Sequence, residues 1–154
     1  MITGRSVAGI LQFLNRTPID WYSKKQATVE SAAYGSGFVA ARTATDKTLD
    51  LVYTLRYLGV RVRPRVHMFG DNESVVNSAS IPQSKLHKRH TTLSYHRVRE
   101  DIASGLIQFH VIPGESNPAY IVSNHWGYAK VWQPLRPLLF WARTEKAKSD
   151  DKPP

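Results

Sequence analysis

The sequence has no cysteine among its 154 residues and is poor in acidic residues. Without a thiol, the chain forms no disulfide, offers no cysteine ligand to zinc and carries no cysteine nucleophile. The 12 Asp and Glu are outnumbered by 21 Lys and Arg, which leaves a formal net charge of +9. This excess of positive charge favours a polyanionic partner, with nucleic acid ahead of an anionic membrane.

Long apolar runs are also missing. The apolar stretch near the N-terminus is interrupted by Gln12, and the sequence PLLFWA near the C-terminus is far too short to span a bilayer. We therefore expect no membrane partner, and the absence of cysteine fits an intracellular protein of the cytoplasm or nucleus. With 42% hydrophobic residues, the chain is suited to one globular domain.

Residue periodicity predicts a mixture of strands and helices. Strands are expected where short apolar runs are bounded by turn residues, and helices where apolar residues recur every three or four positions. The expected strands are 6–14, 19–25, 65–70 and 106–113, and the expected helices are 30–58, 73–79, 85–103 and 118–126. This α/β order begins with an antiparallel hairpin, so a mixed sheet is expected. Residues 147–154 are expected to be disordered.

Asp71 stands between the strand expected at 65–70 and the helix that follows it. From local sequence alone it is a turn or cap residue, and its neighbour Asn72 is suited to cap the helix. In α/β sheets, however, the carboxyl end of a strand faces the ligand crevice, which makes Asp71 a candidate functional residue. The local sequence leaves both interpretations open.

Five short stretches stand in a distinctive order and spacing. They are IDWYSKKQATV (19–29), YGSGFVAARTA (34–44), MFGDNESVV (68–76), SYHRVREDIASGLIQFHVIP (94–113) and ESNPAYIVS (115–123). Together they resemble the ribonuclease H domain of copia-type retrotransposon Pol polyproteins, over about residues 5–123. The resemblance implies a ribonuclease H-like mixed sheet with helices on both faces. It also implies an ancestral activity, the removal of RNA from RNA:DNA hybrids during reverse transcription.

The resemblance further implies a metal site. The family uses two Mg²⁺ ions, held by acids on the first strand, on the first helix, after the fourth strand and on the last helix, because hard cations need several oxygen ligands. Asp71 matches the third of these acids. Gly37 and Tyr120 occupy the positions of the first-helix and last-helix acids, and the first-strand acid would lie before Met1.

Three of the four family carboxylates are therefore absent, and Asp71 is expected to bind Mg²⁺ weakly or not at all. Glu30, Glu73 and Glu115 are poorly placed to replace them. We expect a catalytically inactive remnant that retains at most nucleic-acid binding. The alternative is an active Mg²⁺-dependent ribonuclease of RNA:DNA hybrids, whose missing acids come from a longer reverse-transcriptase polyprotein or from unusual positions.

The missing first strand is central in the family, between the hairpin and the strand that precedes Asp71. At about 4.8 Å per strand, its absence would leave a gap of roughly 9.6 Å with unpaired backbone groups on both sides. Three outcomes are open. Strand 6–14 pairs directly with 66–70, a partner chain completes the sheet, or the protein aggregates.

Basic residues supply the candidates for phosphate contact along an RNA:DNA hybrid. These candidates are Lys24, Lys25, Lys85, Lys88, Arg89, His90, Arg97 and Arg99. The segment 85–99 contains no acid, which fits either a solvated helix face or a row of phosphate contacts. Zinc binding through His87 and His90 is a third interpretation, although neither cysteine nor carboxylate completes such a site.

The chain divides into a ribonuclease H-like domain at 5–126, incomplete at its N-terminus, and a C-terminal extension at 127–154. The extension is rich in aromatic residues, and Pro134 and Pro137 argue against a long helix within it. Its apolar residues are expected either to pack over the sheet or to form a patch for a partner.

Overall fold

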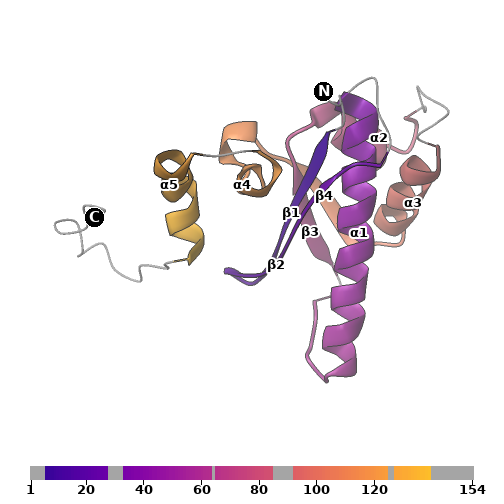
Figure 1. The fold of residues 1–154 in the computed structure, drawn as a ribbon. Coiled ribbons are helices and arrows are strands. Elements are labelled where there is room, and N and C mark those ends of the chain that lie inside the picture. The colour runs from indigo at the N-terminus through magenta and orange to yellow at the C-terminus, as the bar shows by residue number, and fades with distance from the viewer. Residues whose placement is uncertain (1–5, 28–32, 64, 85–91, 125–126, 140–154) are drawn as a thin grey trace.

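The computed structural model describes residues 6–27, 33–63, 65–84, 92–124 and 127–139 (Figure 1). Its strands are β1 (Val7–Leu14), β2 (Thr17–Lys25), β3 (Val66–Gly70) and β4 (Ile107–Val111). Its helices are α1 (Ala33–Tyr57), α2 (Glu73–Ser80), α3 (Thr92–Ala103), α4 (Tyr120–Ser123) and α5 (Tyr128–Leu139), with a 3₁₀ turn, η2 (Gly114–Ser116). Parts of the predictions for 30–58 and 85–103, and all of the prediction for 147–154, lie outside the described residues.

Strands β1 and β2 form an antiparallel hairpin with a two-residue turn. The turn uses Asn15 in the left-handed region, at φ 56°, which asparagine tolerates better than most residues. Strand β2 begins two residues before the predicted start at 19, so Thr17 and Pro18 lie in the strand. The pairing register shifts between Gln12 and Phe13, close to Pro18, and proline is tolerated in strands at such irregularities since it has no N–H for the ladder.

Helix α1 is amphipathic, and its buried positions recur at intervals of three and four. They are Phe38, Ala41, Thr45, Leu49 and Val52. The helix ends before Gly59, whose φ of 77° suits the left-handed residue that commonly follows a helix. In Figure 1 this helix runs alongside the strands and extends beyond them at its C-terminal end.

Strands β3 and β4 form a parallel pair, with partners running from Val66 and Ile107 to Gly70 and Val111. Helices α2 and α3 pack with α1 against one face of this pair. The central cluster of buried residues consists of Phe38, Ala41, Val75, Ala79, Tyr95 and Val98, bordered by Tyr34, Met68, Ile102 and Phe109. This cluster joins the second sheet to the helices and is the main core of the described chain.

The two strand pairs remain separate sheets, although both pack on α1. Gln12 of β1 donates a hydrogen bond to Thr48 at 3.4 Å, and Thr45 donates to the sulfur of Met68 in β3 at 3.9 Å. No ladder of backbone hydrogen bonds joins β1 to β3 among the described residues. The outcome in which strand 6–14 pairs directly with 66–70 is therefore wrong, because each pair is anchored to the helix on its own.

Helix α4 covers the other face of β1. A side chain at Gly9 would meet Ser123 and Ala119 at under 3 Å, so glycine is needed where this helix crosses the strand. The hairpin therefore has α1 on one face and α4 on the other. No helix within the described ranges is both long and apolar enough to cross a bilayer.

Helix α5 packs against α4 and β2 and contains both prolines of the extension. The two prolines were expected to prevent a long helix; α5 spans 12 residues, an ordinary length, and includes both of them. Because proline has no N–H, the carbonyl four residues before it in the helix has no partner there. This carbonyl is that of Lys130 for Pro134 and that of Gln133 for Pro137. Both of these residues are exposed, so water can solvate the freed carbonyls.

Candidate metal and nucleic-acid sites

Asp71 directly follows β3, as the sequence predicts, and is exposed. Asn72 caps α2, since its side-chain oxygen accepts a hydrogen bond from the backbone N–H of Val75 at 3.2 Å. The amide of Asn72 also donates to the carbonyl of Ala33 at 3.4 Å, which ties the end of β3 to the start of α1. Asp71 is thus held at the junction of two elements, next to the cap residue itself.

One cavity of ≈ 270 Å³ brings together Asp71, Gly37 and Tyr120. Gly37 comes from α1, Asp71 from the end of β3 and Tyr120 from the first residue of α4. These are three of the four positions at which the family resemblance places acids. The structure therefore brings the predicted site positions to one place, although only one of them carries a carboxylate.

Gly37 has a packing role in this structure. A Cβ atom at this position would lie 2.7 Å from a methyl group of Val75, whose side chain is almost fully buried. Helices α1 and α2 therefore approach each other too closely for any larger residue at position 37 without movement of Val75. The glycine that brings no ligand is also the residue that permits this close contact.

Two of the three other acids considered as replacements do not border the cavity. Glu73 and Glu115 are absent from its lining, and Glu30 lies outside the described residues. Among the described residues, no group of three or more His, Asp and Glu side chains is arranged to hold a metal ion. Since a pair of Mg²⁺ ions needs several converging carboxylates, the described lining of this cavity does not fit the two-metal site.

Arg97 is engaged in ion pairs on the surface of α3. Its guanidinium lies 3.5 Å from Asp46, 3.8 Å from Glu100 and 3.5 Å from Asp101. Burial raises the pKa of Asp101, and the nearby positive charge of Arg97 opposes this rise. Binding to a phosphate would therefore have to compete with three carboxylates for this arginine.

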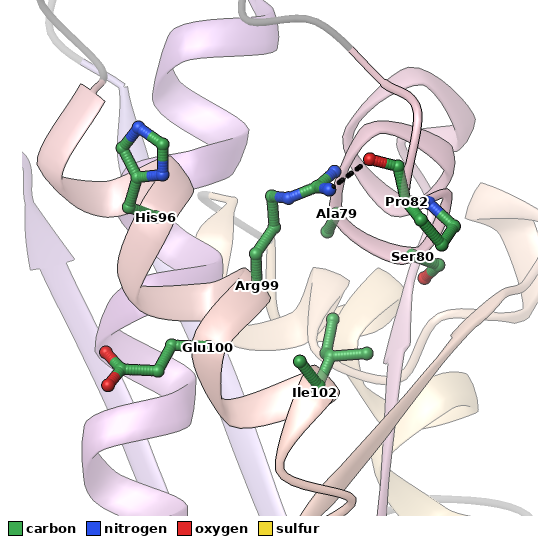
Figure 2. Close-up of a pocket in the computed structure, with 8 residues that line it drawn as sticks. Ala79, Ser80, Pro82, His96, Arg99, Glu100 and Ile102 are labelled. Carbon is green, nitrogen blue, oxygen red and sulfur yellow. Dashed lines mark hydrogen bonds between the residues drawn. The ribbon is translucent and has the colours of Figure 1, made fainter.

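Arg99 binds the C-terminal end of α2 (Figure 2). Its guanidinium donates to the carbonyls of Ser78, Ile81 and Pro82 at 2.7 to 2.8 Å, and it lies 5.1 Å from the centre of the Tyr95 ring. Carbonyls at a helix end have no partner within the helix, and the helix dipole there attracts positive charge. The structure thus gives Arg99 a structural role, and its contact with phosphate stays a prediction.

Lys24 and Lys25 lie exposed at the end of β2. The cation of Lys47, on α1, lies 5.4 Å from the centre of the Tyr22 ring and 2.8 Å from Asp20 on the same strand. The remaining candidates are outside the described residues: Lys85, Lys88, Arg89, His90 and also His87. Their predicted contacts with nucleic acid, and the zinc interpretation, stay predictions.

A further basic stretch was not predicted; it covers the last turn of α1 and the segment that leads from α1 to β3. Arg56, Arg61, Arg63 and Arg65 are all exposed there. We call these four residues the arginine cluster. The sequence between Asp50 and Asp71 contains no acid, and this run without negative charge was the available signal. Exposed Tyr53 and Tyr57 accompany the cluster on α1.

Comparison with known proteins gives one similarity. The chain is 26% identical over 104 residues to "Retrovirus-related Pol polyprotein from transposon RE1" of Arabidopsis thaliana, which covers 67% of this chain and 7% of that protein. No family model matches the chain, and no solved structure matches it. The similarity supports an origin of this chain in a retrotransposon Pol region.

Proposed function

We propose that this protein is a remnant of a retrotransposon ribonuclease H domain that binds RNA:DNA hybrids or other nucleic acid without cleaving them. The single observation that carries the proposal is the cavity shared by Asp71, Gly37 and Tyr120. Three elements converge there as they would around a metal site, yet Asp71 is the only acid among the described residues that line it. Nucleic-acid binding is supported separately by the net charge of +9.

The basic surface suits an extended polyanion better than a small ligand. Lys24 and Lys25 end the hairpin, whereas Arg56 of the arginine cluster lies in the last turn of α1. Helix α1 has 25 residues, which at about 1.5 Å per residue corresponds to roughly 37 Å. Phosphates spaced along a duplex can reach positively charged groups this far apart.

The first experiment measures cleavage. A labelled RNA:DNA hybrid is incubated with the protein and either Mg²⁺ or Mn²⁺, beside the variant Asp71→Asn. We expect no cleavage from either protein, because one carboxylate does not hold two metal ions. Cleavage by the wild type that Asp71→Asn abolishes would contradict the proposal and support the alternative, an active Mg²⁺-dependent ribonuclease of RNA:DNA hybrids.

The second experiment measures binding as a function of salt. Fluorescence anisotropy with the same hybrid should show affinity falling steeply as salt rises. The logarithm of the binding constant should fall with the logarithm of the salt concentration by about 0.7 to 0.9 per phosphate contact. Neutralising the arginine cluster, as Arg61→Gln with Arg63→Gln, should lower this slope. The matched control is Arg42→Gln, an arginine already paired with Asp46 on the surface of α1. Binding that ignores salt, or no binding at low salt, would contradict nucleic-acid recognition.

A further inference from the structure

Two histidines meet on the face of β3 and β4 that points away from the core. Side chains alternate along β3, so Met68 borders the core cluster whereas His67 and Phe69 lie on the opposite face. In the parallel register Phe69 lies beside His110 of β4, which places His110 on this outer face as well. His67 is exposed and His110 is half-buried. The outer face therefore presents two imidazoles that a solute can reach.

The two imidazoles are in contact through their nitrogen atoms. Nδ1 of His67 lies 3.0 Å from Nε2 of His110. The rings are stacked, with centres 5.2 Å apart and planes 30° apart. Phe69 also stacks on the His110 ring, with a distance of 5.2 Å between the ring centres. Stacking contacts and two hydrogen-bonded strands thus position the pair before any ligand binds.

The distance between the two nitrogens suits two ligands of one metal ion. Imidazole nitrogen binds zinc at about 2.0 to 2.1 Å, and we take this length for other transition metals. At that length, nitrogens 3.0 Å apart subtend an angle of about 91–97° at the ion. Neighbouring ligands are roughly 90° apart in a square-planar ion and roughly 109° apart in a tetrahedral one. The pair therefore fits square-planar or tetragonal coordination better than tetrahedral coordination.

We propose that His67 and His110 together bind a Cu²⁺ ion on the outer face of β3 and β4. Tetragonal sites with nitrogen and oxygen ligands are typical of Cu²⁺, which also binds most tightly among the divalent first-row metals. Water supplies the remaining ligands, because His67 is exposed. In the metal-free protein one ring donates an N–H to the other. On metal binding that ring carries its proton on its other nitrogen instead, so both rings stay neutral.

This site is separate from the cavity that contains Asp71. Neither His67 nor His110 lines that cavity. Mg²⁺ prefers oxygen ligands, whereas imidazole suits copper. Two protein ligands make an open site, which agrees with the lack of any group of three or more ligands among the described residues. The inference goes beyond nucleic-acid binding, because a protein that binds no hybrid can still bind copper through these rings.

The test is a calorimetric titration of the full chain, without an affinity tag, with Cu²⁺ in a buffer that does not chelate it. The variants are His67→Gln, His110→Gln and the double variant. The matched control is His96→Gln, which removes a histidine of α3 whose ring contacts Tyr95. Every variant keeps the histidines outside the described residues, which are His87, His90 and His125. Differences between the variants therefore isolate the contribution of the pair.

We expect the wild type and His96→Gln to bind one more equivalent of Cu²⁺ than the double variant. Loss of a partner that only orients a ligand typically weakens metal binding 10- to 100-fold, so each single variant should weaken this site by at least about tenfold. Equal binding by the wild type and the double variant would overturn the proposal. A loss in only one of the single variants would overturn it too, because the ion would then have one histidine ligand.

Circular dichroism without metal checks that each variant is folded. His67→Gln replaces an exposed side chain and should leave the fold intact. If the half-buried position of His110 does not tolerate glutamine, the comparison of His67→Gln with the wild type decides alone. Copper affinity retained by folded His67→Gln would then overturn the proposal, and affinity lost by it would support the site.

Discussion

Removing the guanidinium of Arg99 tests whether this residue is structural or belongs to a nucleic-acid surface. The variant Arg99→Met keeps much of the aliphatic side chain and deletes three hydrogen bonds of 2.7 to 2.8 Å. Hydrogen bonds from charged groups contribute about 1.5–3 kcal/mol each when well buried. Arg99 is only half-buried, so we expect a total loss of about 2–3 kcal/mol after discounting for solvent.

A loss of this size is measurable by thermal or urea unfolding. For a chain of about this length, each kcal/mol lowers Tm by about 2–4 °C, so the expected decrease is about 4–12 °C. Arg99→Lys should fall between the wild type and Arg99→Met, because lysine keeps the charge but cannot bridge several carbonyls with one planar group. The control is Arg42→Met, whose exposed ion pair with Asp46 should contribute less than about 1 kcal/mol.

The binding measurement completes this test. At a temperature where all variants remain folded, Arg99→Met should bind an RNA:DNA hybrid almost as well as the wild type, because its guanidinium already serves the end of α2. An unchanged Tm together with a clear loss of hybrid affinity would refute the reasoning. That result would move Arg99 from the structural residues to the predicted phosphate contacts.

Four further predictions concern the region around the cavity and the buried acid of α3. Gly37→Ala should lower stability by about 1–3 kcal/mol in urea unfolding, and by less when Val75→Ala is also present, because a Cβ at position 37 would lie 2.7 Å from Val75. Asn72→Ala should cost about 1 kcal/mol by loss of the α2 cap, whereas Asn72→Asp should cost less. Mg²⁺ at millimolar concentration should leave the Tm of the wild type and of Asp71→Asn equally unchanged, and a rise confined to the wild type would contradict this. Because burial raises the pKa of Asp101 above its ordinary 3.8, ionisation of this acid disfavours the folded state as pH rises. Asp101→Asn should therefore be more stable than the wild type at pH 7, with a difference that shrinks as pH falls towards 4; a difference independent of pH would contradict the stated cause.

The elements that sequence predicted well are those decided by local chemistry. The spacing of apolar residues located α1, and the side chain of Asn72 caps α2 as its position suggested. Asp71 also stands where the strand before it ends. Each of these features depends on residues within about one or two turns of chain, which a single sequence displays directly.

The features that sequence missed depend on distant parts of the chain or on solvent. Pro18 continues β2 because the ladder is irregular opposite it, and Pro134 lies within α5 beside carbonyls that water can reach. The separation of β1 from β3 is a property of the whole sheet, since both strands would have suited direct pairing by composition. Only the helix contacts at Thr45 and Thr48 reveal that the strands are anchored apart.

The single acid in the described lining and the close packing around the cavity both bear on metal binding. Two carboxylates about 4 Å apart repel each other by about 4 kcal/mol at an effective dielectric of 20, so an acid cluster needs bound cations to be stable. Among the described residues of the lining Asp71 is the only acid, so this repulsion is absent between them, and Gly37 lets α1 approach Val75 closely. Placing an acid at position 37 would therefore introduce charge repulsion with Asp71 and also force Val75 out of place. With one acid in the described lining, no cation is needed there to offset repulsion between carboxylates. The same shortage of carboxylates makes the cavity unsuited to two-metal chemistry.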